Sequence, residues 1–430
     1  MVRIIVVGGG LAGCAAASAA AKAGASVTLL ERTEVLGGCG LWSGALDKKC
    51  LPVREELRFM SGDDIFAVLE TCTLHDNVKF PWPKPSGAVK RLFDVTRVDG
   101  ALLKHLKKVG VEVRLPSRAK DVKMDGKCIR SVILDDETCL EGDAFVDATG
   151  GAGGFENCQK YGNGCAMCFM RCPAFGDRVS IVQKAGVKEL AGKKGDGSIG
   201  PMSAACTLLK ETMAPELRKE LETTGRAFIA LPQELIHYKR TESITASVNI
   251  DAGFAENVVL ADIGAYAKRI AAGYAPLHEL RRVPGLENVR YIDPYAGTIG
   301  NAIRFMAVSP RDNALQVPGI ENLFVASEKL GVSGIPTAIM TGVLAGHNSL
   351  RMAVGMTPLV VSRNTIFGDF FAYVNERWDK EEGLRKRFNT FHGPYLKRTE
   401  ELGLYTEDKT ILRSRIEEND LVNVFAKRLH

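Results

Sequence analysis

The sequence predicts an α/β fold built on a parallel β-sheet. Three observations lead to this expectation: a β-branched run at the start, an alanine-rich stretch directly after it, and a second apolar run that ends in an acid. This order of strand, helix and strand is that of a βαβ unit. The length of 430 residues leaves room for two or three domains.

The composition is that of a folded globular protein. Apolar residues make up 46% of the chain and charged residues 25%, which excludes disorder as the dominant state. No transmembrane helix is expected, since no run of about eighteen apolar residues lacks a charge or a glycine break. The opening MVRIIVVGGG has no cleavage site typical of a signal peptide, so we expect a cytoplasmic protein without a membrane partner. The net charge of +5 is too mild for a dedicated nucleic-acid binder.

The first thirty-one residues contain the clearest motif. Residues 3–7 form a run typical of a buried parallel strand, and a glycine turn follows them. The alanine-rich stretch 14–22 predicts a helix that ends at Gly24, and 26–30 predicts a second strand followed by Glu31. Strand, glycine turn, helix, strand and acid in this order are the fingerprint of a dinucleotide-binding unit.

Each fingerprint position has a physical task. Gly8 makes the tight turn, Gly10 lets the backbone approach a pyrophosphate at the helix N-terminus, and Gly13 lets helix and strand pack closely. Glu31 can accept hydrogen bonds from ribose hydroxyls, and an acid here argues against a 2′-phosphate. The residues of this unit that we expect at the cofactor are Gly8, Gly10, Leu11, Ala12, Gly13, Glu31 and Arg32.

Later segments favour FAD over NAD. Residues 36–40 provide a second glycine-rich approach to the ligand, and the strand 144–147 ends in an Ala-Thr-Gly turn. The strand 322–327, which is followed by Glu328, resembles the flavoprotein strand whose terminal acid binds the ribityl chain. A glycine-rich turn then opens a helix over 338–346, whose N-terminal dipole can stabilise negative charge on a reduced flavin. The candidate residues in these segments are Gly37, Gly38, Ala148, Thr149, Gly150, Glu328, Gly334 and Thr337.

The stretch from 321 to 365 resembles the C-terminal FAD region of the GidA and TrmFO group of tRNA-modifying flavoproteins. The matching motifs are Gly-Val-Ser-Gly at 331–334 and Gly-Val-Leu-Ala-Gly at 342–346, with Pro358 and Thr365 after them. The resemblance implies a Rossmann-like FAD-binding domain of the glutathione-reductase type and an FAD-dependent oxidoreductase. In that group a thiol after the first flavin unit helps to move a one-carbon unit from methylenetetrahydrofolate to uridine. Cys50 lies at a similar distance and is the catalytic candidate, with a buried structural cysteine as the alternative.

Four cysteines crowd into residues 158–172, which read CQKYGNGCAMCFMRC. The spacing Cys-x2-Cys-x3-Cys-Pro matches the end of the bacterial ferredoxin run and favours an iron–sulfur cluster, most simply [4Fe–4S]. We expect Cys158, Cys165, Cys168 and Cys172 as ligands, with Cys206 as the less favoured substitute for Cys158. A structural zinc and a redox-active dithiol formed by Cys165 and Cys168 remain open alternatives.

We expect a discontinuous domain organisation. Residues 1–155 and 290–355 form the FAD-binding domain, 156–289 an inserted cysteine-rich α+β cap or substrate domain, and 356–430 a helical C-terminal tail. No second glycine fingerprint has a βαβ unit behind it, so no nicotinamide domain is expected. The electrons then come from a reduced cofactor or from a ferredoxin-type donor.

Three functions follow from these expectations. The first is an FAD-dependent oxidoreductase whose iron–sulfur cluster relays electrons to the flavin, with a small-molecule substrate under the cap. The second is a folate- and FAD-dependent enzyme that modifies a tRNA uridine through Cys50. The third is a non-catalytic redox sensor that binds flavin and zinc. Each function is compatible with a homo-oligomer.

Overall fold

A central parallel sheet carries the fold, and it confirms the predicted α/β class. The structure is a computed structural model that describes residues 1–38, 44–81, 88–151, 179–193, 197, 201–204, 206–236, 256–270, 277–292, 303–305, 307–391 and 393–429. The sheet has five strands in the order β19-β10-β1-β2-β6, and every neighbouring pair is parallel. These strands are β1 (Arg3–Val7), β2 (Ser26–Leu30), β6 (Glu112–Arg114), β10 (Ala144–Asp147) and β19 (Leu323–Val325).

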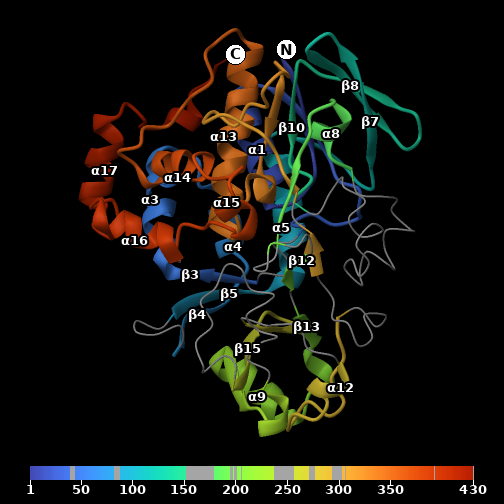
Figure 1. Cartoon of the computed structure of the whole chain (residues 1–430), viewed down its shortest axis with the longest axis vertical. Coiled ribbons are helices and arrows are strands. Elements are labelled where there is room, and N and C mark those ends of the chain that lie inside the picture. The colour runs from blue at the N-terminus through green and yellow to red at the C-terminus, as the bar shows by residue number, and fades with distance from the viewer. Residues whose placement is uncertain are drawn as a thin grey trace.

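Two helices, α1 (Leu11–Lys22) and α13 (Ile335–Ala353), pack against each other beside this sheet (Figure 1). A Cβ atom added at Gly342 would lie 2.1 Å from the carbonyl oxygen of Ala12, and one at Gly346 2.1 Å from that of Ala16. The contact advances four residues along both helices, so the helices run parallel. Their N-termini therefore lie on the same side. Along the shared direction of the two helices, α13 begins about 9 Å before the first residue of α1.

The remaining upper part of the molecule consists of helices and one small sheet (Figure 1). The antiparallel sheet contains β7 (Ala119–Asp125), β8 (Cys128–Leu134) and β9 (Cys139–Glu141). The helices before and after it in the chain are α3 (Leu51–Phe59), α4 (Asp64–Glu70), α5 (Val95–Lys108) and α8 (Ile181–Lys184). The C-terminal helices are α14 (Ile366–Asn375), α15 (Glu381–Arg385), α16 (Gly393–Glu401) and α17 (Lys409–Glu418), which confirms the predicted helical tail.

Antiparallel strands and short helices make up the lower part of the molecule (Figure 1). One sheet has the order β3-β5-β4 and another the order β13-β16-β15-β14. These strands are β3 (Ala45–Asp47), β4 (Thr73–Phe80), β5 (Ala88–Phe93), β13 (Cys206–Leu209), β14 (Arg226–Ala230), β15 (Asn257–Asp262) and β16 (Tyr266–Arg269). The helices are α9 (Pro215–Thr224) and α12 (Leu277–Leu280). A shared apolar cluster joins the two sheets, with Val78 and Phe80 packed on the side of Val259 and Ala261.

The chain leaves the central sheet after β10 and returns to it at β19. Between them lie two further antiparallel pairs, β11 (Leu190–Ala191) with β18 (Ala307–Val308) and β12 (Pro201–Ala204) with β17 (Ile303–Phe305). A chain that leaves a sheet and later returns to it is what a discontinuous domain requires. The domain boundaries at 155, 290 and 355 stay predictions. Across the described ranges, no helix has both the length and the apolar character needed to span a bilayer.

Candidate functional site

The glycine turn between β1 and α1 closes tightly on one side and is open on the other. A Cβ atom at Gly13 would lie 1.8 Å from the carbonyl oxygen of Gly8, and one at Gly8 2.4 Å from that of Ala148. A Cβ atom at Gly10 would meet nothing within 4 Å. Gly10 caps α1 without a side-chain hydrogen bond, and the first turn holds no acid. The N–H groups at the start of α1 therefore have no side-chain cap and can bind an anion in the open space, whereas those of Gly8 and Gly9 donate to Leu30 and Glu31.

Glu31 is fixed beside this turn at the end of β2. One carboxylate oxygen accepts the N–H of Gly9 at 2.8 Å, and the other accepts the N–H and the hydroxyl of Thr33 at 2.8 and 2.9 Å. Leu11 and Ala12 are buried in the first turn of α1, whereas Arg32 is half-buried next to Glu31. The carboxylate thus stands where the fingerprint requires an acceptor for ribose hydroxyls.

The second glycine segment lies directly against the first. The N–H of Gly37 donates to the carbonyl oxygen of Gly9 at 2.8 Å, and Gly37 forms a parallel bridge with Gly10. A Cβ atom at Gly38, where φ is +49°, would lie 3.1 Å from the Cα atom of Gly10. Only two backbones without side chains can approach each other this closely.

A third group of candidates gathers at the carboxyl ends of β10 and β19. Asp147 ends β10 and accepts the N–H and the hydroxyl of Thr149 at 3.0 and 2.6 Å, while Gly150 has φ +83° and open space at its Cβ position. A Cβ atom at Gly151 would lie 3.0 Å from the Cβ atom of Glu328. The turn after β10 and the segment after β19 are therefore direct neighbours.

The N-terminus of α13 resembles that of α1. Gly334 caps it with φ +99° and without a side-chain hydrogen bond. The hydroxyl of Thr337 donates to the carbonyl oxygens of Ser333 and Gly334 at 2.6 and 2.8 Å, so Thr337 shapes this turn. Two parallel helices thus present uncapped N-termini on the same side. An elongated dinucleotide with a pyrophosphate at one helix and a flavin at the other fits this arrangement.

Cys50 is the one predicted thiol that the structure describes in full. It lies in η1 (Lys48–Cys50), and its side chain is buried. Burial, aided by the nearby carboxylate of Asp47, raises the pKa of the Cys50 thiol. A buried neutral thiol is a poor nucleophile, so a catalytic role would require this thiol to become exposed.

The cysteine cluster falls outside the described residues. This applies to Cys158, Cys165, Cys168 and Cys172, while Cys206 is described only as part of β13. Within the part of the chain that the structure describes, no three His, Cys, Asp or Glu side chains gather as metal ligands would. The iron–sulfur, zinc and dithiol alternatives therefore stay predictions.

The sequence analysis missed a buried charged cluster next to Glu328. Lys329 lies between the carboxylates of Asp147 and Glu189, and all three side chains are buried. Burial lowers the pKa of Lys329, but the two carboxylates outweigh it and raise the pKa. Asp147 was visible as the last residue of a strand, whereas nothing in the sequence pairs Lys329 with residues so far away in the chain.

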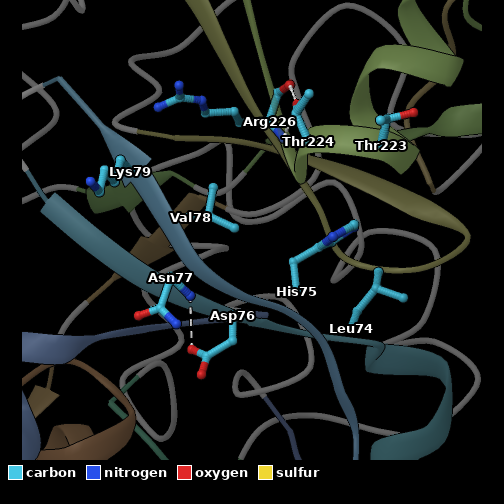
Figure 2. A pocket seen from close by; sticks show the side chains of 9 residues that line it. All are labelled: Leu74, His75, Asp76, Asn77, Val78, Lys79, Thr223, Thr224 and Arg226. Atoms are coloured by element: carbon cyan, nitrogen blue, oxygen red, sulfur yellow. Dashed lines mark hydrogen bonds between the residues drawn. The ribbon is translucent and has the colours of Figure 1, made fainter.

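A polar cavity of about 470 Å³ lies between β4 and the end of α9 (Figure 2). His75 on its wall contacts the buried Asp262 with 2.9 Å between Nε2 and Oδ2, and hydrogen bonds from Arg91 lower the pKa of Asp76 to about 2. The lining residues are Leu74, His75, Asp76, Asn77, Val78, Lys79, Thr223, Thr224 and Arg226. None of them is an expected dinucleotide-binding residue, so this cavity is separate from the candidate site.

Two family models match the two segments of the chain that contain the candidate residues. The model described as FAD dependent oxidoreductase matches residues 3–153. The model described as Glucose inhibited division protein A matches residues 276–357.

Curated relatives match over short stretches. A methylenetetrahydrofolate–tRNA-(uracil-5-)-methyltransferase TrmFO of Lysinibacillus sphaericus is 30% identical over 104 residues, which cover 24% of this chain and 23% of that protein. A tRNA uridine 5-carboxymethylaminomethyl modification enzyme MnmG of Acholeplasma laidlawii is 36% identical over 90 residues, which cover 20% of this chain and 14% of that protein. The matches thus span less than a quarter of these relatives' own lengths.

A solved structure extends the similarity to nearly the whole chain. GidA of Aquifex aeolicus superposes with a TM-score of 0.59 at 16% identity, covering 97% of this chain and 76% of that one. At this identity the superposition is informative about the fold.

Proposed function

Because this chain belongs to the GidA/TrmFO-like superfamily of FAD-dependent oxidoreductases, we propose that it binds one FAD across α1 and α13 and exchanges electrons with a substrate there. The observation that carries this proposal is the pair of parallel helices whose N-termini lack side-chain caps. FAD supplies reversible hydride or single-electron transfer once bound.

The residues of the chain have distinct tasks in this proposal. The backbone around Gly10 binds the pyrophosphate, and Glu31 orients the ribose. Glu328 binds the ribityl chain beside the turn at Gly150. The N-terminus of α13 at Gly334 stabilises negative charge on the reduced ring.

The test is the visible absorption spectrum of the purified protein, before and after anaerobic reduction with dithionite. The proposal expects the bands of an oxidised flavin in a ratio of one FAD per chain, and bleaching on reduction. Protein that is colourless and takes up no FAD on reconstitution would contradict it. The identity of the small-molecule substrate is then accessible from the compounds that reduce or reoxidise the bound flavin.

We further propose that Cys158, Cys165, Cys168 and Cys172 hold an iron–sulfur cluster that receives electrons from a ferredoxin-type donor. The support is their ferredoxin-like spacing. Iron and acid-labile sulfide in anaerobically purified protein test it, and Cys168→Ala is expected to remove the iron while FAD stays bound. The matched control is Cys139→Ala at an exposed cysteine. Iron retained in Cys168→Ala rules out this ligand set, and zinc in place of iron favours the sensor alternative.

A second candidate function is the modification of a tRNA uridine with a folate-derived one-carbon unit. It is favoured by the names of the TrmFO and MnmG relatives. The assay is transfer of the methylene carbon of labelled methylenetetrahydrofolate to tRNA by the flavin-loaded protein. In this function Cys50→Ser abolishes transfer and leaves FAD binding intact. Absence of transfer by the flavin-loaded wild-type protein excludes it.

A further inference from the structure

Lys329 is a fully buried lysine held by two buried carboxylates. Its Nζ atom lies 2.6 Å from Oε1 of Glu189 and 3.3 Å from Oδ2 of Asp147, and the three side chains have 0% exposure. Nζ also donates to the hydroxyl of Ser180 at 2.6 Å. A lysine is almost never buried unless it is paired, so these contacts determine where this part of the chain can lie.

The cluster joins three segments that are distant in the sequence. Asp147 ends β10 and holds the turn at Thr149, which is an expected FAD contact. Glu189 directly precedes β11 and also accepts a hydrogen bond from Ser309. Lys329 lies in η4 (Ser327–Leu330), directly after the expected ribityl-binding Glu328. One ammonium group therefore ties the two walls of the candidate FAD site together.

The backbone at η4 needs such a tie. Ser327 has φ +75°, a left-handed conformation that is unfavourable for a residue with a side chain. Its N–H donates to the hydroxyl of Thr341 in α13 at 2.9 Å. Residues held in this region of φ persist only where the surrounding structure fixes them, and they occur preferentially at ligand sites.

Glu328 and Lys329 point in different directions from η4. Lys329 reaches inward to the carboxylates, while Glu328 contacts Arg387 with 3.1 Å between Oε1 and Nη1 and retains 16% side-chain exposure. Because the residues are adjacent, the position of Lys329 sets that of Glu328. With no exposed surface, Lys329 itself cannot touch a bound FAD.

We propose that Lys329 is a positioning residue for FAD: its ion pairs with Asp147 and Glu189 hold Glu328 and the turn at Thr149 at the spacing that the bound flavin requires. This inference rests on the proposed FAD binding. Lys329 then contributes to the affinity for FAD and to the environment of the flavin ring, although it does not contact the cofactor.

The test compares Lys329→Met with a matched control at another buried ion pair. The control is Arg415→Met, which breaks the ion pair between Arg415 in α17 and Glu56 in α3. Nη1 of Arg415 lies 3.2 Å from Oε1 of Glu56, and the side chain of Glu56 has 0% exposure. Removing one partner of a buried pair destabilises a protein, so both variants are expected to lower the melting temperature. The deciding readouts are the dissociation constant for FAD and the visible circular dichroism of the bound flavin.

Lys329→Met is expected to weaken FAD binding at least about tenfold and to change the flavin circular dichroism, since the two carboxylates then repel each other and η4 shifts. Arg415→Met is expected to leave both readouts unchanged. If Lys329→Met fails to fold, the double variant Lys329→Met with Glu189→Leu also removes one of the two buried carboxylates. The other, that of Asp147, keeps its hydrogen bonds from Thr149, Ser180 and Val182. The double variant is expected to fold and still bind FAD more weakly.

Two results separate this inference from the proposed function. A wild-type chain that binds no FAD overturns both. A wild-type chain that binds FAD, together with an unchanged affinity and circular dichroism in the folded Lys329 variant, overturns the positioning role alone.

Discussion

We expect His347 to make the stability of the protein sensitive to mild acid. The residue lies in α13 with 0% exposure, and its ring packs edge-on against Phe425 with 5.2 Å between the centroids. Among the described residues, neither of its ring nitrogens has a hydrogen-bond partner. Burial, together with the positive charge of Arg351, lowers the pKa of His347 from 6.5 to about 4. The native protein therefore holds this imidazole neutral.

The sign and size of the effect follow from this difference. In the unfolded chain His347 takes up a proton near pH 6.5, whereas in the folded chain it does so only near pH 4. Its contribution to stability is thus fully present above pH 6.5 and is lost as the pH falls toward 4. At about 1.36 kcal/mol per pKa unit, the full loss amounts to about 3 kcal/mol, and about 2 kcal/mol of it occurs by about pH 5.

The assay is urea unfolding of the wild type and of His347→Leu at pH 7 and at pH 5, followed by circular dichroism. Leucine keeps an apolar contact with Phe425 and cannot be protonated. Other acidic and basic groups titrate equally in both proteins, so they cancel in the difference between the two unfolding free energies. That difference is expected to move by about 2 kcal/mol in favour of the variant at pH 5. A difference that is the same at both pH values refutes the reasoning.

The remaining predictions concern the FAD site. Gly13→Ala places a Cβ atom 1.8 Å from the carbonyl oxygen of Gly8, so we expect it to destabilise the protein by about 1–3 kcal/mol and to abolish FAD binding in a fluorescence titration. Its control is Gly100→Ala, whose Cβ atom meets nothing within 4 Å and which is expected to gain about 0.5–1 kcal/mol as a residue inside α5. Native affinity in Gly13→Ala would show that the turn tolerates a side chain. Glu31→Gln removes a charge that accepts three hydrogen bonds and is expected to raise the dissociation constant for FAD about tenfold, while Glu34→Gln at the exposed neighbour leaves it unchanged. An equal affinity for both Glu variants would exclude the assigned role of Glu31.

The parts of the fold that depend on local signals were predictable from the sequence. The run at 3–7, the glycine turn and the acid at 31 are contiguous, and each is a recognised local pattern, so the first βαβ unit was expected almost residue by residue. The full length of α13 was harder to predict from the sequence. We expected a helix over 338–346, whereas the structure extends it to Ile335–Ala353. Most of the added residues, 335–337 and 347–350, are buried against other parts of the chain, which the sequence does not reveal.

Contacts between residues far apart in the chain could not be predicted from the sequence. Lys329 reads as an ordinary surface lysine, and only the fold brings Asp147 and Glu189 to it. For Cys50 the sequence suggested a role that the structure does not favour. Its distance from the glycine turn suggested a reactive thiol, but its burial follows from packing that no local pattern encodes. The spacing of residues in the sequence can suggest a reactive group, but the surrounding structure determines the pKa of that group and its exposure to a substrate.

The central claim is that the N-termini of α1 and α13 bind opposite ends of one FAD molecule. Calorimetric titration of the cofactor-free protein with FAD, with FMN and with ADP tests it most directly. We expect one FAD to bind per chain, far more tightly than either FMN or ADP, and both fragments to compete with FAD. FAD affinity no greater than that of a single fragment, or no FAD binding at all, would contradict it.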